Sequence, residues 1–403
     1  MRALAVIVHR WVGLAIAGFL VLTGLTGAII AWDHELDAWL NPHLLTAQGT
    51  GPARDALQLA EAVEARHPDV RVTWLPLQAE SGHAWAFWVE PRAPVPGVAP
   101  AQPGFNQVFV DPFSGQELGQ REWGGVWPIT RENAVSFLYK LHYSLHLPAV
   151  AGTDRWGVWL LGGVALAWTI DCFTGLLIAS PTRRAAWRVR WGGSRYKLNF
   201  DLHRAASLWT WALLLTLAFT AFAMNLHREL FMPMLSAISD VTPTPLDTLP
   251  VAAEPPAASV TRRQAVEAAM AEAQRQGWQA PAGSLFHSPW QGVYAIAFHA
   301  ADADHGEGGA GHRQIFIDSA TGAVLGQRTP WEGTAADLFV QAQYPLHSGR
   351  ILGLPGRILV SVMGVVVAGL SLTGVYIWWR KRRAVRVGRA RQASQDKAAA
   401  QPA

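Results

Sequence analysis

The chain has 403 residues; half of them are hydrophobic, only 15% are charged, and the formal net charge at pH 7 is +4. About a quarter of the residues of a soluble domain are charged, so this composition is atypical of a soluble enzyme and favours a chain that lies partly in lipid. The only cysteine, Cys172, excludes intrachain disulfides, iron–sulfur clusters held by several thiolates and the two-cysteine attachment of a c-type haem.

Four apolar runs are predicted to span a membrane. At about 1.5 Å of rise per helical residue, runs of this length cross the roughly 30 Å hydrocarbon core of a bilayer. Only the second run contains a charged residue, Asp171. In chain order the runs are 12–32, 156–180, 205–226 and 358–379.

Basic residues beside these runs predict the orientation. The loop after the second run is rich in arginine and lysine between Arg183 and Lys197, and the tail after the fourth opens with the basic run 380–383. Basic loops stay on the cytoplasmic side. Both chain ends are therefore expected inside, with 33–155 and 227–357 outside. This asymmetry explains most of the net charge without a nucleic-acid partner. The first run is too long for a signal peptide, so we expect an uncleaved anchor.

The sequence reads as a tandem duplication of about 195 residues per half. Each half opens with a His-Arg pair, His9-Arg10 or His203-Arg204, and a second histidine, His34 or His227, closes its first spanning run. Helical stretches at 62–66 and 262–275 precede β-type runs at 84–89 and 293–298, and then strands that end in Asp-x-x-x-Gly turns at 108–115 and 315–322. Insertions also correspond, a Pro-rich one at 91–103 and a Gly/His-rich one at 301–312.

These features make the chain resemble the PepSY-associated transmembrane proteins, often called iron-regulated membrane proteins, over nearly its whole length. The resemblance rests on the opening His-Arg-Trp, on 199–205, on the two turn motifs and most firmly on 344–357 and 373–379. It implies a polytopic membrane protein with a four-helix transmembrane bundle and two extracytoplasmic α+β PepSY domains. Similar proteins include inner-membrane ferri-siderophore reductases, which implies two non-covalent b-type haems.

The resemblance and the charge pattern together predict a multi-pass protein of the bacterial inner membrane. The expected segments are transmembrane helices at 1–33, 155–181, 205–227 and 357–379; periplasmic PepSY domains at 34–154, with flanking interfacial helices, and at 228–356; a basic cytoplasmic loop at 182–204; and a basic cytoplasmic tail at 380–403.

Half of the fourteen histidines lie at predicted membrane boundaries. Ionisable residues at membrane depth are costly and tend to be functional, and bis-His ligation of haem iron needs two imidazoles that face each other. A duplicated bundle supplies such pairs from equivalent positions. We expect His9 and His203 to form an inner pair on the cytoplasmic side. The boundary histidines are His9, His34, His142, His146, His203, His227 and His347.

An outer pair is expected to contain His347. Its partner is His142 by alignment of the two Leu-His dipeptides, or His146 by spacing to the next helix, and His142 is favoured slightly. Because the two candidates are four residues apart, one helical face can present both. His34 and His227 are competing ligands of lower rank, since His34 opens a polar interfacial segment.

Several arginines near these histidines could pair with haem propionates, because a guanidinium binds a carboxylate bidentately. Arg155 and Arg357 are the better candidates, since the cytoplasmic preference for basic residues does not explain them. For Arg10 and Arg204, contact with lipid headgroups explains their position nearly as well.

Asp171 is the one acid within a spanning run, so a functional role is the first hypothesis: a hydrogen bond to a ligand imidazole, or transfer of a proton that compensates an electron. The alternative is a carboxyl group that burial keeps protonated. Glycines recur in the spanning runs and permit either close helix packing or the approach of a flat macrocycle. They are Gly13, Gly18, Gly24, Gly27, Gly162, Gly163, Gly175, Gly364, Gly369 and Gly374.

The insertion 302–312 carries carboxylates and imidazoles of metal-binding type, but its first-half counterpart has none, so a mobile hairpin loop is favoured over an iron site. No nucleotide-binding glycine motif and no serine-nucleophile motif appears in the sequence. The resemblance to the family implies a haem b oxidoreductase. It would take electrons from an unidentified cytoplasmic or membrane donor and reduce a ferric chelate, such as a ferri-siderophore, outside the membrane.

Two other classes of function remain open. A PepSY-based regulatory or binding protein would fold without a cofactor. A transporter of iron or of a chelate would be favoured by a broken helix or by several polar residues at the membrane midplane, and in the sequence only Asp171 is of that kind.

Overall fold

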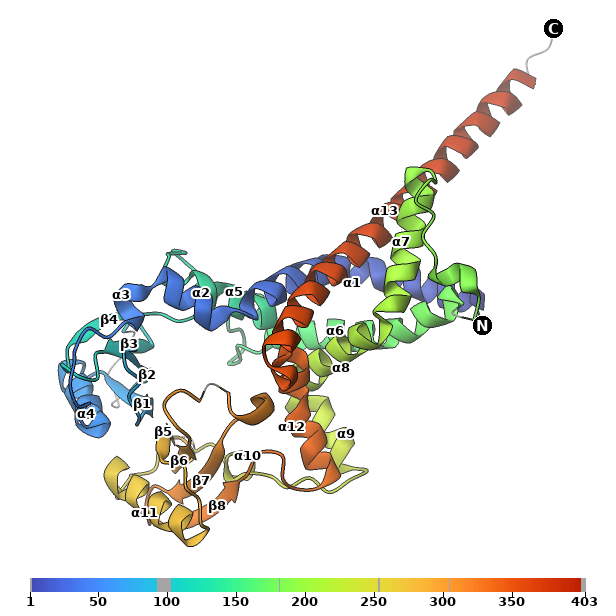
Figure 1. Cartoon of the computed structure of the whole chain (residues 1–403). Coiled ribbons are helices and arrows are strands. Elements are labelled where there is room, and N and C mark those ends of the chain that lie inside the picture. The colour runs from blue at the N-terminus through green and yellow to red at the C-terminus, as the bar shows by residue number, and fades with distance from the viewer. Residues whose placement is uncertain (1, 93–102, 181, 253, 304, 400–403) are drawn as a thin grey trace.

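The computed structural model describes residues 2–180, 182–252, 254–303 and 305–399, except for 93–102. Most of the Pro-rich insertion and Asp304 of the Gly/His-rich insertion therefore lie outside the described residues. The chain forms a group of long apolar helices at one end and a sheet at the other (Figure 1). The N-terminus and the C-terminal end of the last helix lie away from the sheet.

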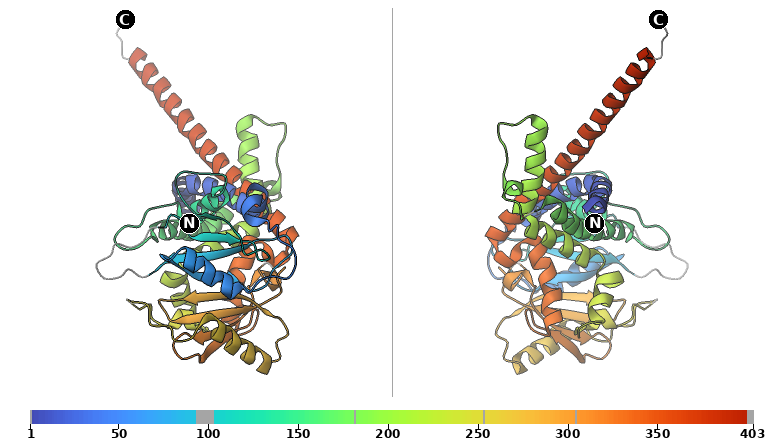
Figure 2. Two further views of the ribbon diagram at one scale, coloured as in Figure 1. Left: turned by 90° about the vertical axis from the view of Figure 1, so that its left-hand side faces the viewer. Right: turned by 90° about the vertical axis from the view of Figure 1, so that its right-hand side faces the viewer.

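Three helices in the described part of the chain are each long and apolar enough to cross a membrane: α1 (Arg2–Ile30), α6 (Trp156–Ala179) and α13 (Leu354–Ala399). They match the first, second and fourth predicted runs. Helix α13 continues far beyond the predicted end at residue 379, and its basic C-terminal part projects from the rest of the molecule (Figure 2). Arginine has a high helix propensity, which is consistent with a helical rather than an irregular tail.

The third run is not one straight helix, contrary to the prediction. It is divided into α7 (Arg195–Trp209) and α8 (Trp211–Asn225), which meet at an angle of 71°. The hydroxyls of Ser207 and Thr210 donate to the carbonyls of His203 and Ala206, four residues earlier. Such bonds back to the helix carbonyls bend helices. Sequence hydropathy could not detect the break because apolar residues flank it on both sides.

Close approach of the helices depends on glycine at several crossings. A Cβ on Gly24 of α1 would lie 2.6 Å from the carbonyl oxygen of Gly364 in α13, and one on Gly162 of α6 would lie 2.5 Å from the side chain of Leu226. Neither distance is tolerable for a real side chain. These glycines therefore serve close helix packing, as small residues do in membrane bundles.

The strands of both halves form one antiparallel sheet of eight strands in the order β4-β3-β2-β1-β5-β6-β7-β8. The two predicted PepSY domains thus share a single sheet, which is joined at β1 and β5 by pairs such as Leu75 with Leu285. The strands are β1 (Val70–Pro76), β2 (Trp85–Pro91), β3 (Gln107–Val110), β4 (Glu117–Arg121), β5 (Ala282–Ser288), β6 (Val293–Phe298), β7 (Arg313–Asp318) and β8 (Val324–Arg328).

The helices α4 (Ala56–Arg66) and α11 (Arg262–Arg275) pack against this sheet and complete one continuous apolar core. Fully buried side chains of both halves, such as Val72 and Ile296, belong to it. An ion pair between Glu64 of α4 and Arg262 of α11 ties the halves together, and both residues also bond to the backbone of Val72. Because the core crosses the β1–β5 junction, the two halves stabilise each other.

The predicted Asp-x-x-x-Gly turns are present in both halves. Asp111 accepts hydrogen bonds from the amides of Phe113 and Ser114, and Asp318 does so from Ala320 and Thr321. Asp111 is buried and also accepts from Gln48 and Gly49. Burial alone would raise its pKa, but these backbone donors outweigh burial and hold the pKa of Asp111 below its usual value of 3.8.

Short helices connect the sheet to the long helices. Two of them, α5 and α12, each lead from the sheet to a spanning helix and each carry one of the predicted outer histidines. The remaining helices and turns are α2 (Asp33–Leu40), α3 (Pro42–Leu45), α5 (Ala134–Ser144), η1 (Arg184–Trp187), η2 (His227–Phe231), α9 (Met232–Ser236), α10 (Pro245–Thr248), η3 (Glu307–Gly309), α12 (Ala335–Ser348) and η4 (Arg350–Leu352).

Candidate functional site

Two pairs of histidines face each other from opposite halves of the chain. The rings of His142 in α5 and His347 in α12 have centroids 6.2 Å apart and are tilted by 56°. The rings of His9 in α1 and His203 in α7 have centroids 6.3 Å apart, also at 56°. We refer to them as the outer pair and the inner pair. Nearly identical geometry at both pairs follows from the duplication, because equivalent helices carry equivalent histidines.

The separation within each pair fits a single iron ion. An imidazole nitrogen lies about 2 Å from a metal that it binds, and the ring centre lies roughly 1 Å further out. Two imidazoles on opposite sides of one iron therefore have centroids about 6 to 6.5 Å apart. Rings in ordinary contact also lie at such distances, as Phe219 and Phe231 do at 6.2 Å. The recurrence of one distance and one tilt at equivalent positions of both halves is what points to a shared ligand.

At three of the four histidines, Nδ1 is engaged in a hydrogen bond, which leaves Nε2 of the ring available to bind a metal. In the outer pair, Nδ1 of His142 lies 3.0 Å from the hydroxyl of Thr26, and Nδ1 of His347 lies 2.9 Å from that of Thr220. Each threonine donates its own proton to a carbonyl of its helix, so it can only accept from the histidine. The network thus assigns the proton to Nδ1 and an unprotonated lone pair to Nε2.

The same arrangement holds His203 of the inner pair. Its Nδ1 lies 2.9 Å from the hydroxyl of Thr373, which donates to the carbonyl of Leu370. Nδ1 also lies 3.1 Å from that carbonyl. His203 is therefore held in the same tautomer as the two outer histidines.

His9 differs from the other three because its partner is a carboxylate. Its buried Nδ1 lies 2.9 Å from Oδ2 of Asp171, a close contact that falls outside good hydrogen-bond geometry. The other carboxylate oxygen of Asp171 accepts from the hydroxyl of Thr174 at 2.6 Å. Asp171 is buried in α6, with Gly13 of α1 beside it.

Three glycines lie against the imidazoles. A Cβ on Gly27 would come within 2.9 Å of the ring of His142, one on Gly374 within 3.2 Å of His203, and one on Gly175 within 3.5 Å of His9. The sequence left two roles open for the glycines of the spanning runs. The structure separates these three from those that serve helix crossings, because only these three contact the paired histidines.

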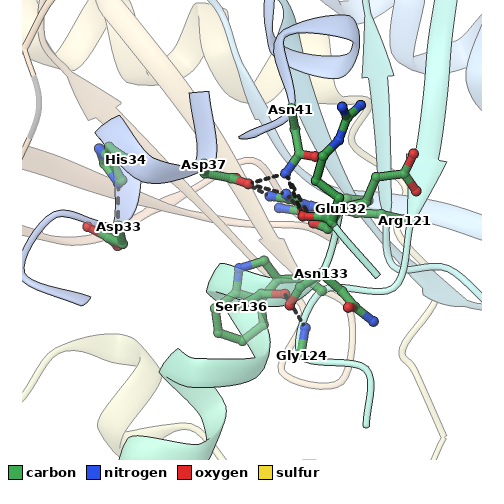
Figure 3. A network of polar contacts seen from close by, with 12 residues as sticks. Asp33, His34, Asp37, Asn41, Arg121, Gly124, Glu132, Asn133 and Ser136 are labelled. Carbon is green, nitrogen blue, oxygen red and sulfur yellow. Dashed lines mark hydrogen bonds and ion pairs between the residues drawn. The ribbon is translucent and has the colours of Figure 1, made fainter. Parts of the chain in front are cut away.

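A buried polar network fixes the start of α5, and thereby His142, relative to the sheet (Figure 3). Arg121 at the end of β4 binds both carboxylate oxygens of Asp37 in α2, at 2.7 and 2.8 Å. It also donates to the carbonyl of Glu132, just before α5. The hydroxyl of Ser136 within α5 accepts from the amide of Gly124. Bidentate pairing of this kind is geometrically specific, so α5 is held by the sheet as well as by α1.

In the second half, a capping box fixes α12 and thereby His347. Asp337 accepts from the amides of Thr334 and Thr242, and Thr334 caps the helix. Burial alone would raise the pKa of Asp337, but these hydrogen bonds outweigh it and keep that pKa below its usual value. The two halves thus use different polar contacts for the same task.

The other candidate histidines are not part of either pair. The prediction that His142 and His146 share a helical face is wrong, because α5 ends at Ser144 and both Leu145 and His146 have left-handed backbone. The ring of His146 stacks on Phe137 and bonds to its carbonyl. His34 is largely exposed and lies 5.3 Å from the ring of His305.

The candidate propionate partners are engaged with protein groups. Arg155 forms an ion pair with Glu229 at 2.7 Å, and Arg357 one with Glu35 at 2.6 Å. Arg204 binds the buried Asp201, one helical turn earlier in α7. Arg10 is exposed on α1. A role of these residues at a haem stays a prediction.

A cavity of about 1320 Å³ lies beside the outer pair, between α12, β8 and the segment after α8. Tyr344 and Pro345 on its wall are within one helical turn of His347. His227, the last of the candidate histidines, is also on the wall. Other polar lining residues include the basic groups of Arg228, His305, His312 and Arg328 and the carboxyl groups of Asp247, Glu332 and Asp337, besides Thr244 and Gln341.

The Gly/His-rich insertion connects the antiparallel strands β6 and β7, as expected of a hairpin loop, and its described residues line this cavity and pack against α12. The mobility of this loop stays a prediction. His305 stacks on Tyr344 at 5.9 Å, and His312 stacks on His299 at 4.0 Å. Over the described residues, which exclude Asp304, no group of three or more His, Cys, Asp or Glu side chains gathers in metal-binding geometry.

The long apolar helices, together with the sheet that they carry, define a membrane protein with a large domain outside the lipid. A family model for the PepSY-associated TM region matches residues 6–381, almost the entire chain. The chain therefore belongs to the PepSY-associated transmembrane family, as its sequence motifs predicted. A comparison with curated proteins found no match.

The sequence analysis missed the threonines that bond to the histidines. Thr26 and Thr220 each lie seventeen residues after the first histidine of their half, His9 and His203. This repeated spacing was a usable signal, but the threonine role depends on α5 and α12 folding back onto α1 and α8. Nothing local in the sequence encodes that contact.

Proposed function

We propose that this protein carries electrons across the inner membrane through two b-type haems and reduces a ferric chelate, such as a ferri-siderophore, in the periplasm. The observation that carries this proposal is the repeated histidine geometry: two pairs at 6.2 and 6.3 Å, with Nδ1 of three of the four rings hydrogen-bonded. Haem bound at each pair would supply one-electron redox chemistry.

The protein's own residues would supply binding, orientation and spacing. His9 and His203 would hold one haem, and His142 and His347 the other. In α1, the proposed ligand His9 and Thr26, which bonds to the outer ligand His142, are seventeen residues apart, which is about 25 Å along the helix. The two pairs would therefore lie toward opposite faces of a bilayer and together bridge most of its apolar core.

The cavity beside His347 is a suitable place for the acceptor. Its volume of about 1320 Å³ exceeds that of an ordinary small-ligand pocket and would accommodate a bulky chelate. Its wall reaches Tyr344, one helical turn from the outer pair, so a bound chelate would lie near the outer haem. Fe(II) is held more weakly than Fe(III) by hard oxygen ligands, so reduction there would loosen the iron.

The break at Thr210 supports transport of iron or a chelate as a second candidate, since broken helices mark many transporter sites. However, the backbone bonds on both sides of the break are retained, from Thr210 to Ala206 and from Leu214 to Thr210. The break lies seven residues from His203 and ten from Thr220, at the middle of the path that α7 and α8 form. A break of this kind suits a bundle that bends around the histidines as well as it suits a substrate path.

A visible difference spectrum of the detergent-purified protein, reduced with dithionite minus oxidised, tests the proposal together with a pyridine haemochrome count. We expect a low-spin b-type spectrum with two haems per chain. In proteoliposomes with a reductant trapped inside, we expect reduction of an external ferric trihydroxamate without its uptake. A folded, colourless protein from haem-replete cells would refute the proposal, and uptake without reduction would favour the transporter.

A further inference from the structure

The duplication is broken at one position of the inner pair. Residues 171–175 of α6 and 370–374 of α13 are equivalent, because the Thr-Gly steps at their ends, Thr174-Gly175 and Thr373-Gly374, align. Both glycines contact a histidine of the inner pair. Asp171 in the first half occupies the position that Leu370 occupies in the second.

This one exchange changes what the histidine contacts. In the second half, the hydroxyl of Thr373 bonds directly to Nδ1 of His203. In the first half, the hydroxyl of Thr174 donates to Asp171 at 2.6 Å, and the carboxylate lies against Nδ1 of His9 instead. Of the four paired histidines, His9 alone has a carboxylate at Nδ1, and both outer histidines have threonine hydroxyls.

A carboxylate at Nδ1 strengthens an imidazole as a metal ligand. It draws the Nδ1 proton toward itself, which increases the electron density at Nε2 and favours the more highly charged metal ion. Its negative charge acts in the same direction through space, and it does so whether or not the contact is aligned as a hydrogen bond. In an apolar helix bundle this charge is poorly screened.

We infer that Asp171 sets the direction of electron flow by giving the inner site a lower reduction potential than the outer site. The inference rests on the proposed haem sites. Asp171 stabilises ferric over ferrous iron between His9 and His203, whereas the neutral hydroxyls of Thr26 and Thr220 do not do so at the outer pair. One electron from a cytoplasmic or membrane reductant then moves downhill from the inner ferrous iron to the outer ferric iron, and from there to the ferric chelate. Asp171 is a positioning residue that acts through His9.

The test is a potentiometric titration of the purified holoprotein, followed at the haem α-band. We expect two one-electron steps, and in His347→Ala only the lower step should remain. Asp171→Asn should raise the lower step and leave the upper one unchanged. The matched control is Thr26→Val, which removes a neutral partner at the outer pair and should leave the lower step unchanged.

A gain-of-charge variant keeps the test decisive if Asp171→Asn fails to retain haem. Leu370→Asp places a carboxylate at the equivalent position beside His203, and it should lower the inner step further. Combined as Asp171→Leu/Leu370→Asp, the two changes move the charge from one imidazole to the other and should restore a low inner potential. The inference is overturned if the inner site has the higher potential, or if Asp171→Asn moves the upper step or neither step. Wild-type protein without haem would instead refute the proposed function itself.

Discussion

The two halves of this protein have the same elements in the same order, yet they differ in one spanning helix and in one residue beside the inner pair. Each half supplies one histidine to each pair, one four-stranded part of the shared sheet and one aspartate-centred turn. The first half has a continuous α1, and the second a helix broken at Thr210. The first half also carries Asp171 where the second has Leu370. The two halves therefore share one scaffold, and Asp171 makes the inner pair unlike the outer pair.

The largest expected effect tests whether both halves contribute to both sites. His347→Ala and His9→Ala should each remove one of two haems, because each leaves its partner imidazole without a second axial ligand. The haemochrome count per chain measures this. His146→Ala is the matched control, since its ring stacks on Phe137 and faces neither pair. Loss of haem in His146→Ala with retention in His142→Ala would reverse the assignment.

Removing the contact that joins the halves should destabilise the whole sheet. Glu64→Ala removes the carboxylate that pairs with Arg262 and that accepts from the amide of Val72, in a largely buried position. We expect a loss of about 3 kcal/mol in the free energy of unfolding, read as a lower melting temperature in detergent. Glu272→Ala, which breaks an ion pair with the exposed Arg275, should cost under about 0.5 kcal/mol. Equal losses in the two variants would mean that the Glu64–Arg262 contact contributes no more to stability than an exposed ion pair.

The two turns should differ in their sensitivity to pH. Asp111 is held by four backbone amides and Asp318 by two. The pKa of folded Asp111 lies below its usual value of 3.8, so its contribution is complete above about pH 4 and is lost as the pH falls through the folded pKa. Asp111→Asn should cost about 2 kcal/mol at neutral pH and flatten the stability profile below pH 4. Asp318→Asn should do less, and melting curves between pH 3 and 7 would show it.

The smallest effect concerns the glycines beside the imidazoles. Gly27→Ala places a methyl group 2.9 Å from the ring of His142, which must then shift, whereas Gly175→Ala places one at an ordinary 3.5 Å from His9. We expect Gly27→Ala to cost about 1 kcal/mol and to perturb only the outer haem band. Gly175→Ala should leave both bands as they are. A perturbation confined to the inner band in Gly27→Ala would contradict this assignment of the sites.

The sequence by itself determined the features that depend on local pattern. Hydropathy over twenty residues fixes α1, α6 and α13, and the Asp-x-x-x-Gly turns are encoded within a few residues because the aspartate bonds to amides just after it. The family followed from motifs spread along the chain, and the family match confirms it. The assignment of haem to the histidines remains a prediction.

Only the tertiary structure decided which residues meet. It chose His142 over His146, because α5 ends between them in a left-handed turn that the sequence did not reveal. It merged two expected domains into one sheet, because the edge strands β1 and β5 satisfy each other's backbone groups. It also placed Asp171 beside His9, although 162 positions separate the two residues in the chain. Such contacts arise from helix packing over long sequence distances, where hydropathy and spacing carry no information about partners.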